Sequence, residues 1–312
     1  MSEQASEQAP ALPPVGFIGL GTMGAPMVRN LAAAGYPVVL HDADPAARDR
    51  LAEQTGGTAA SGPADFAPVA AIVTMLPTSR IVAAALLDWD GGIPAHLAPG
   101  TVVIDMSSSD PTETVLLGER LAAAGVTLVD APVSGGVLRA EDGTLSIMLG
   151  GDDEDALARA VPVVEAMSAR IFRTGRLGSG HAMKALNNFV AAAATTAACE
   201  ALIAGERFGL DQQTMVDVFN ASTGQSWVSS NVLGQHVVSR TFGSGFALGL
   251  YAKDVGIARH LTEAMDHPAP VCHAVSAALD DALSAVGDVD HTRAMTHWEH
   301  LTTAPSPTTS RT

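Results

Sequence analysis

The sequence predicts an α/β protein in which a doubly wound parallel sheet comes first and an all-helical domain follows. In the first half, short apolar segments such as residues 15–20 and 101–106 alternate with helix-like segments. This alternation is typical of parallel strands joined by right-handed helical crossovers. After Gly180 no strand pattern remains, and the low aromatic content of 4% suits closely packed, alanine-rich helices.

The elements follow from the same apolar segments, taken in chain order. Short apolar or β-branched runs favour buried strands, and longer runs without Pro or Gly favour helices. Strands are expected in residues 15–20, 37–42, 70–76, 101–106, 126–131, 145–151 and 171–175. Helices are expected in residues 24–36, 46–52, 81–87, 113–124, 183–208, 212–222, 229–239, 253–265 and 270–286.

Four regions of the chain result. Residues 1–14 and 303–312 are polar and Pro-containing, and we expect disordered tails there. Residues 15–178 form the first domain and residues 179–302 the helical one. The helix that opens at Gly178 joins the two domains without a flexible linker.

The charge balance excludes several function classes. A net charge of −16 argues against nucleic acid and against anionic membranes as partners. The two cysteines show no paired or metal-binding spacing, so we expect reduced thiols and a cytoplasmic protein. No signal peptide is evident, and residues 185–199 are too short and polar for a membrane span.

The sequence gives little support for a metal site. The ten histidines are scattered, and His291, His297 and His300 are expected on a solvated helix face. The acidic residues 152–155 resemble a calcium loop only in charge, and they are expected at a helix N-terminus.

A glycine motif follows the first predicted strand. Gly19, Gly21 and Gly24, with Thr22 and Met23 between them, form GxGxxG at the point where a strand turns into a helix. Such glycines let the backbone approach a pyrophosphate whose charge lies at the helix N-terminus. A structural turn without a ligand is the alternative.

Asp42 ends the next strand, at the distance of about 20 residues that dinucleotide-binding folds use. A carboxylate there accepts hydrogen bonds from an adenosine ribose and repels a 2′-phosphate. The motif and Asp42 together therefore predict NAD as the cofactor, in preference to NADP.

Two further strand ends carry polar residues. Ser134, Gly135 and Gly136 could hold a carboxylate through a hydroxyl and bare backbone N–H groups, or they could form a plain turn. Ser107 follows a strand at the sheet edge where ligands bind, although a helix N-cap before Pro111 is an equal alternative.

Lys184 and Asn188 lie one turn apart on the predicted joining helix. Only Lys184 and Lys253 are lysines among the 17 basic residues, and the others are arginines. An ammonium can give up its proton near neutral pH, whereas a guanidinium effectively cannot. Lys184 is therefore the candidate for moving a proton, and a solvated helix lysine is the alternative.

Taken together, these motifs resemble the β-hydroxyacid dehydrogenase family, which includes 3-hydroxyisobutyrate dehydrogenase. The resemblance covers residues 15 to about 301 and comprises four motifs in order. They are GLGTMGAPM from Gly19, DAPVSGG from Asp130, GSGHAMKALNN from Gly178, and Lys253-Asp254.

The resemblance implies an N-terminal Rossmann domain that binds NAD, a long linking helix, an all-α C-terminal domain, and dimers or tetramers. It makes Lys184 the proton-transfer residue and Asn188 its partner at the substrate. It places the substrate carboxylate on Ser134, Gly135 and Gly136. The implied cofactor contacts are Met75, Leu76, Pro77, Ser107 and Lys253.

The expected function is therefore NAD-dependent oxidation of a short β-hydroxyacid, or the reverse reduction. Tartronate semialdehyde reduction and threonate oxidation are alternatives within the family, and a non-catalytic NAD-binding scaffold is an alternative outside enzymes. The residues leave the substrate open, together with the direction of reaction and the role of Arg139.

Overall fold

The computed structural model describes residues 11–301, so the predicted tail 303–312 and residues 1–10 lie outside the described part. The chain divides into two compact units between Lys184 and Ala185, within one continuous helix. The domain ranges given from the sequence stay predictions, and each compact unit is described by itself below.

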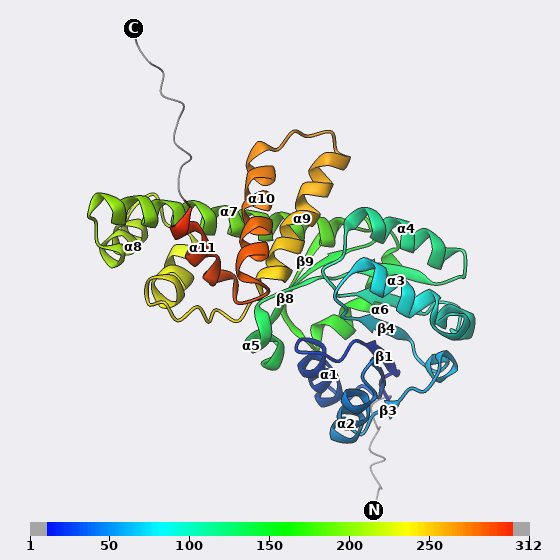
Figure 1. Cartoon of the computed structure of the whole chain (residues 1–312). Helices are drawn as coiled ribbons and strands as arrows, with labels where there is room; N and C mark the ends of the chain where they lie inside the picture. The colour runs from blue at the N-terminus through cyan, green and yellow to red at the C-terminus, as the bar shows by residue number, and fades with distance from the viewer. Residues whose placement is uncertain (1–10, 302–312) are drawn as a thin grey trace, which may run out of the picture. The chain divides into compact units, whose positions relative to one another are not determined.

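The first unit is built on one mixed, mainly parallel sheet (Figure 1). The strand order is β3-β2-β1-β4-β5-β6-β8-β7, with β9 paired to β8. The strands are β1 (Val15–Ile18), β2 (Val38–His41), β3 (Thr58–Ala59), β4 (Ala71–Thr74), β5 (Val102–Asp105), β6 (Thr127–Asp130), β7 (Val133–Ser134), β8 (Leu145–Gly150) and β9 (Ser168–Gly175).

Strands β1 to β6 pair in parallel, in agreement with the predicted doubly wound sheet. Strand β8 departs from this parallel pattern, because it runs antiparallel to β6 and β7 and parallel to β9. Apolar runs indicate burial and not strand direction, so the sequence pattern could not reveal this reversal.

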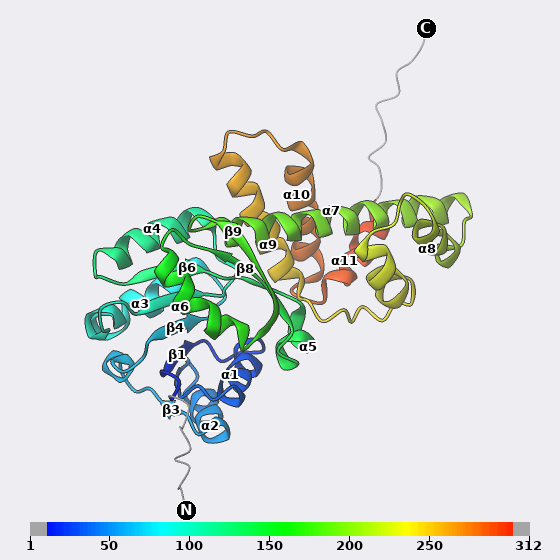
Figure 2. The ribbon, with the colours of Figure 1, turned by 180° about the vertical axis from the view of Figure 1, so that it is seen from behind.

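Helices cover both faces of the sheet (Figures 1 and 2). They are α1 (Gly24–Ala33), α2 (Pro45–Thr55), α3 (Ser79–Leu87), α4 (Pro111–Ala122), α5 (Gly136–Glu141) and α6 (Glu154–Glu165). Phe17 points into the core on the α1 and α6 side, and its neighbour Ile18 points into the core under α3 and α4. This alternation of side chains is the period-two pattern of a strand buried on both faces.

The acidic run 152–155 behaves as predicted. Asp153 is the N-cap of α6, and its carboxylate accepts hydrogen bonds from the backbone N–H groups of Asp155 and Ala156. Residues 152–155 therefore stabilise a helix N-terminus.

The second unit is helical among the residues that the structure describes. Its helices are α7 (Ser179–Phe208), which begins in the first unit, α8 (Gln212–Ala221), a π-helix (Ser229–Val238), α9 (Leu248–Ala264), α10 (Pro270–Val286) and α11 (Ala294–His300). Leu202, Leu233 and Trp298 belong to its largest core cluster. The five helices predicted after residue 180 are all present, although α9 begins at Leu248 and not at Lys253.

The expectation for the C-terminal histidines is wrong for His291. Its ring is 8% exposed and packs against Tyr251, with 4.6 Å between ring centroids. Burial lowers the pKa of His291 to about 4. His291 is therefore a neutral core residue, and only His297 and His300 lie on α11.

Helix α7 (Ser179–Phe208) is longer than residues 185–199, the segment judged too short for a membrane span. By length and composition alone it is the one helix in residues 11–301 that could cross a membrane. Of its apolar 18-residue stretch, 44% is buried inside the protein. The core helix of a non-membrane protein passes the same test. Val190, at 64% exposure, lies on its uncovered face, so packing against a second subunit stays a prediction.

Candidate functional site

The glycine motif forms the turn between β1 and α1. Gly19 has φ +98°, and a Cβ there would lie 2.3 Å from the Met75 carbonyl oxygen; a Cβ on Gly24 would lie 1.9 Å from the Gly19 carbonyl oxygen. A Cβ on Gly21 would meet nothing within 4 Å, and its φ is not left-handed. The fold therefore requires glycine at 19 and 24, whereas at Gly21 glycine keeps open space beside the helix N-terminus. This fits the close approach of a pyrophosphate.

The predicted acidic residue points back to this turn. Asp42 Oδ2 accepts a hydrogen bond of 2.6 Å from the Leu20 backbone N–H, and Oδ1 accepts one of 2.8 Å from the Asp44 N–H. Thr22 is exposed in the same loop, and Met23 is half-buried as the N-cap residue of α1. The carboxylate is thus held beside the glycine turn, where a ribose of a dinucleotide would bind.

Two basic side chains close to Asp42, His41 and Arg48, offer no free positive charge to a 2′-phosphate. Burial lowers the pKa of the neighbouring His41, which stacks on Trp89 at 3.7 Å between ring centroids, so the imidazole is neutral at pH 7. Arg48 is engaged by Asp49 and by the Ala60 carbonyl oxygen. This subsite therefore disfavours a 2′-phosphate.

Ser107 lies under the segment Met75–Pro77. It is fully buried, and its Oγ accepts a 2.9 Å hydrogen bond from the Leu76 backbone N–H. The N-cap alternative is wrong, because Asp110 caps α4 by accepting from the Thr112 N–H. Ser107 thus holds the loop after β4, and its contact with the cofactor stays a prediction.

The residues Ser134, Gly135 and Gly136 leave the sheet at β7 and enter α5. Gly135 has φ +138° and Gly136 φ +70°, conformations that favour glycine, and both are exposed. Helix α5 is tied to α1 by a 2.7 Å hydrogen bond from Asn30 Nδ2 to the Ala140 carbonyl oxygen. The predicted carboxylate-binding residues are therefore presented to solvent from a fixed backbone.

Asp130 anchors the first turn of α7. Its Oδ1 accepts a hydrogen bond from the Gly178 N–H and its Oδ2 one from the His181 N–H, both at 2.8 Å. A Cβ on Gly180 would lie 2.2 Å from the Met148 carbonyl oxygen, so the turn packs directly on β8. Lys184, half-buried one turn further along, is thereby fixed to the carboxyl edge of the sheet.

The His181 ring extends this buried network. Thr114 Oγ1 donates to the Asp110 carbonyl oxygen, so it must accept from His181 Nδ1, 2.8 Å away. His181 Nδ1 therefore carries a proton. Nε2 lies 3.7 Å from Asp105 Oδ2, a carboxylate that is itself 1% exposed.

Sequence reasoning did not identify Asp105, Asp130 or His181 as site residues. One signal was available, because Asp105 and Asp130 each end an apolar strand at the edge where ligands bind. His181 carries no comparable signal, since its partners come from distant parts of the chain.

In the second unit, Asn188 is held by Asp254. Asn188 Nδ2 donates a 2.6 Å hydrogen bond to Asp254 Oδ2, and both side chains are buried. Lys253 Nζ lies 3.2 Å from Asp254 Oδ1. Asp254 thus orients two predicted site residues, a role that the motif alone did not indicate.

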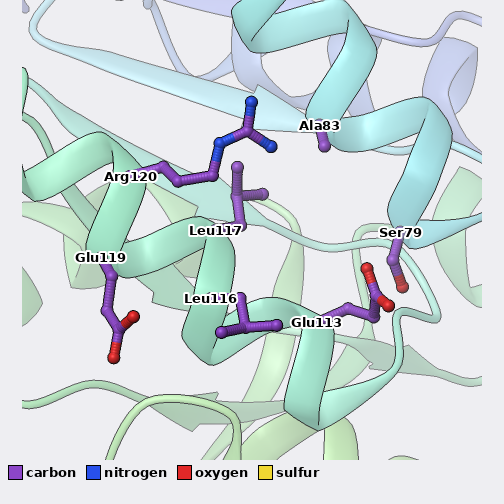
Figure 3. Close-up of a pocket in the computed structure, with 7 residues that line it drawn as sticks. All are labelled: Ser79, Ala83, Glu113, Leu116, Leu117, Glu119 and Arg120. Carbon is purple, nitrogen blue, oxygen red and sulfur yellow. The ribbon is translucent and has the colours of Figure 1, made fainter.

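The remaining features do not compete with these residues. A cavity of about 330 Å³ lies between α3 and α4, with Arg120 and Glu113 at its rim (Figure 3). None of the predicted site residues lines it. In residues 11–301, no group of three or more His, Cys, Asp or Glu side chains could hold a metal ion.

Comparison with known families agrees with the geometry of the first unit. Residues 14–175 match the family model described as the NAD-binding domain of 6-phosphogluconate dehydrogenase. Residues 178–298 match the model described as the NAD-binding domain of NADP-dependent 3-hydroxyisobutyrate dehydrogenase.

Individual relatives are similar over most of their length. The NAD-dependent L-serine dehydrogenase of Pseudomonas aeruginosa is 37% identical, over 82% of this chain and 88% of the relative. The 2-(hydroxymethyl)glutarate dehydrogenase of Eubacterium barkeri is 32% identical, over 92% and 95%. The solved structure of Mycobacterium tuberculosis 3-hydroxyisobutyrate dehydrogenase with L-serine matches with a TM-score of 0.84 and 32% identity, over 92% and 99%.

The prediction from the four motifs is therefore confirmed at the level of family, fold and cofactor. The chain belongs to the β-hydroxyacid dehydrogenase family, and it is a NAD-dependent oxidoreductase that acts on the hydroxyl group of hydroxyacids.

Proposed function

We propose that this enzyme oxidises the hydroxymethyl group of a short β-hydroxyacid of the 3-hydroxyisobutyrate type, with Lys184 as the general acid–base. The observation that carries the proposal is the anchoring of α7 by Asp130, which fixes Lys184 in the unit that holds the dinucleotide-binding turn. A proton-transfer group needs such fixed placement at the reacting atom.

The remaining residues divide the work as follows. Ser134, Gly135 and Gly136 bind the substrate carboxylate, and Asn188, oriented by Asp254, hydrogen-bonds the substrate. Neutral Lys184 accepts the hydroxyl proton in oxidation, and its ammonium returns a proton in reduction. Bound NAD supplies the hydride acceptor.

Three substrates of one type test the proposal. 3-Hydroxyisobutyrate, L-serine and 2-(hydroxymethyl)glutarate, to which the names of the relatives point, all have the form HOCH2–CH(R)–COO⁻. We expect NAD reduction, followed by absorbance, with at least one of the three. A panel with glycerate, which is the reduced form of tartronate semialdehyde, and with threonate covers the other family substrates. Binding of NAD without turnover of any hydroxyacid would favour the non-catalytic scaffold.

The cofactor preference gives a separate prediction for Asp42. The enzyme should have a much higher kcat/KM with NAD than with NADP, because the carboxylate accepts ribose hydroxyls and repels a 2′-phosphate. Asp42→Ser should reduce the ratio of kcat/KM with NAD to kcat/KM with NADP, mainly by lowering the KM for NADP. Steady-state kinetics with both cofactors measure it. Equal kcat/KM values in the unmodified enzyme would contradict the assignment.

Two further expectations belong to the proposal. A homodimer or homotetramer would cover the exposed face of α7, where Val190 lies. A cytoplasmic location accords with the unpaired spacing of Cys199 and Cys272, which are free thiols in the structure.

A further inference from the structure

The side chain of Arg139 lies across Gly135, in the middle of the proposed carboxylate-binding residues. A methyl group added to Gly135 would lie 2.6 Å from Arg139 Cδ, 2.8 Å from its Cβ and 3.2 Å from its Cγ. The aliphatic part of the arginine therefore covers the Gly135 backbone. The guanidinium begins one bond beyond Cδ, so a positive charge stands at the edge of this site.

The backbone fixes this placement. Arg139 is in α5, which is tied to α1 through Asn30 and the Ala140 carbonyl oxygen at 2.7 Å. The Arg139 carbonyl oxygen accepts a 2.8 Å hydrogen bond from the Thr144 N–H. Because Arg139 Cβ itself lies close to Gly135, the position of the side chain is set by the turn and not only by a flexible rotamer.

The guanidinium is available to a ligand. Arg139 is exposed, and no hydrogen bond or ion pair joins its guanidinium to another residue in the described part of the chain. Arg48, Arg173, Arg240 and Arg259, by contrast, each pair with a carboxylate. In a chain with a net charge of −16, an unengaged cation beside an anion-binding turn favours a negatively charged group there.

We propose that Arg139 selects β-hydroxyacids HOCH2–CH(R)–COO⁻ in which R carries a second anionic group. This inference rests on the proposed role of Ser134–Gly136 in binding the first carboxylate. When that carboxylate is bound to the turn, R projects from the adjacent carbon. The guanidinium of Arg139, whose side chain crosses Gly135, is then within reach of R. An arginine also suits this task because its N–H fork binds a carboxylate through two parallel hydrogen bonds.

Substrates that differ only in the charge of R give the sharpest test. R is a carboxyethyl anion in 2-(hydroxymethyl)glutarate, a methyl group in 3-hydroxyisobutyrate and an ammonium in L-serine. In 2-(hydroxymethyl)pentanoate R is propyl, which controls for length without charge. We expect the highest kcat/KM for the dianion and the lowest for serine, because the guanidinium attracts the first and repels the second.

Two variants separate charge from shape. Arg139→Met keeps the aliphatic cover of Gly135 and removes the charge, and Arg139→Lys keeps the charge. We expect Arg139→Met to lower kcat/KM for the dianion by roughly 5- to 30-fold. This loss corresponds to a free energy between that of an exposed ion pair and that of a hydrogen bond to a charged group. The value for 2-(hydroxymethyl)pentanoate should change little, and that for serine should rise. Arg139→Lys should retain most of the preference.

Arg159→Met is the matched control, since Arg159 is also exposed in the first unit and its loss changes the net charge equally. It should leave the ranking of substrates unchanged. Calorimetric titration of the NADH-loaded protein with glutarate supplies a readout other than turnover. The affinity should fall in Arg139→Met and not in Arg159→Met.

Three outcomes would overturn the inference. The first is an unmodified enzyme that does not prefer the dianion. The second is an equal loss in Arg139→Met for all substrates, which would assign the arginine to the common carboxylate. The third is a raised Kd for NAD in Arg139→Met, which would assign it to the cofactor. A failure of the proposed function would give a different result, because the unmodified enzyme would then turn over none of these substrates.

Discussion

Replacing Lys184 with arginine should lower kcat by roughly 10²- to 10⁴-fold, the usual range for a lost general acid–base group. Arginine keeps the positive charge and most of the length of lysine, but it holds its proton at any accessible pH. A residue that only attracts the substrate carboxylate would tolerate this change. Steady-state and single-turnover kinetics with the best substrate of the panel measure the loss.

The other lysine supplies a matched control for this variant. Lys253 pairs with Asp254, and Lys253→Arg preserves that pairing, so kcat should fall far less than in Lys184→Arg. Lys184→Ala should be at least as impaired as Lys184→Arg. Both Lys184 variants should bind NAD as the unmodified enzyme does, because the glycine turn is unchanged. A Lys184→Arg enzyme with near-normal kcat would eliminate the proton-transfer role.

The Asp130→Ala variant should lose roughly 2–6 kcal/mol of unfolding free energy. The substitution leaves the buried N–H groups of Gly178 and His181 without acceptors, and each such loss costs about 1–3 kcal/mol. Chemical denaturation followed by tryptophan fluorescence measures the loss in the first unit when Trp227 and Trp298, which lie in the second, are replaced by phenylalanine in both proteins. The remaining folded protein should also show kcat reduced by about 10²-fold, since Lys184 would no longer be fixed.

Asp153→Ala separates this effect from ordinary helix capping. Asp153 also accepts two backbone hydrogen bonds at a helix start, but it is exposed on α6. Its loss should cost only about 1 kcal/mol and leave kcat unchanged. If Asp130→Ala behaved like Asp153→Ala in both stability and kcat, Asp130 would have no part in positioning Lys184.

Much of the fold could be predicted because its elements are regular. The strands β4 and β5 are buried on both faces, so their sequences are apolar runs up to the last residue, which is Thr74 in β4 and Asp105 in β5. The two-residue strand β7 and the six-residue helix α5 are too short to show a period. Their geometry depends on pairing with β8 and on the Asn30 hydrogen bond, which come from distant residues.

The site divides in the same way. Residues that belong to contiguous motifs, such as the glycine turn and Lys184, could be named from the sequence alone. Residues that act by positioning another residue could not be identified from the sequence alone. Asp254 holds Asn188 from 66 positions away, and Asp130 holds the start of α7 from about 50 positions away. Such pairings are set by tertiary packing, which no local spacing records.

The passage of α7 through the division of the chain bears on attempts to dissect this enzyme. Lys184 and Ala185 are adjacent residues of one helix, so no connecting loop separates the two compact units. A truncated chain that begins at Ala185 would start inside that helix, without the Asp130 carboxylate that accepts its first N–H groups. Limited proteolysis should accordingly spare this junction, because proteases cleave exposed loops in preference to ordered helix.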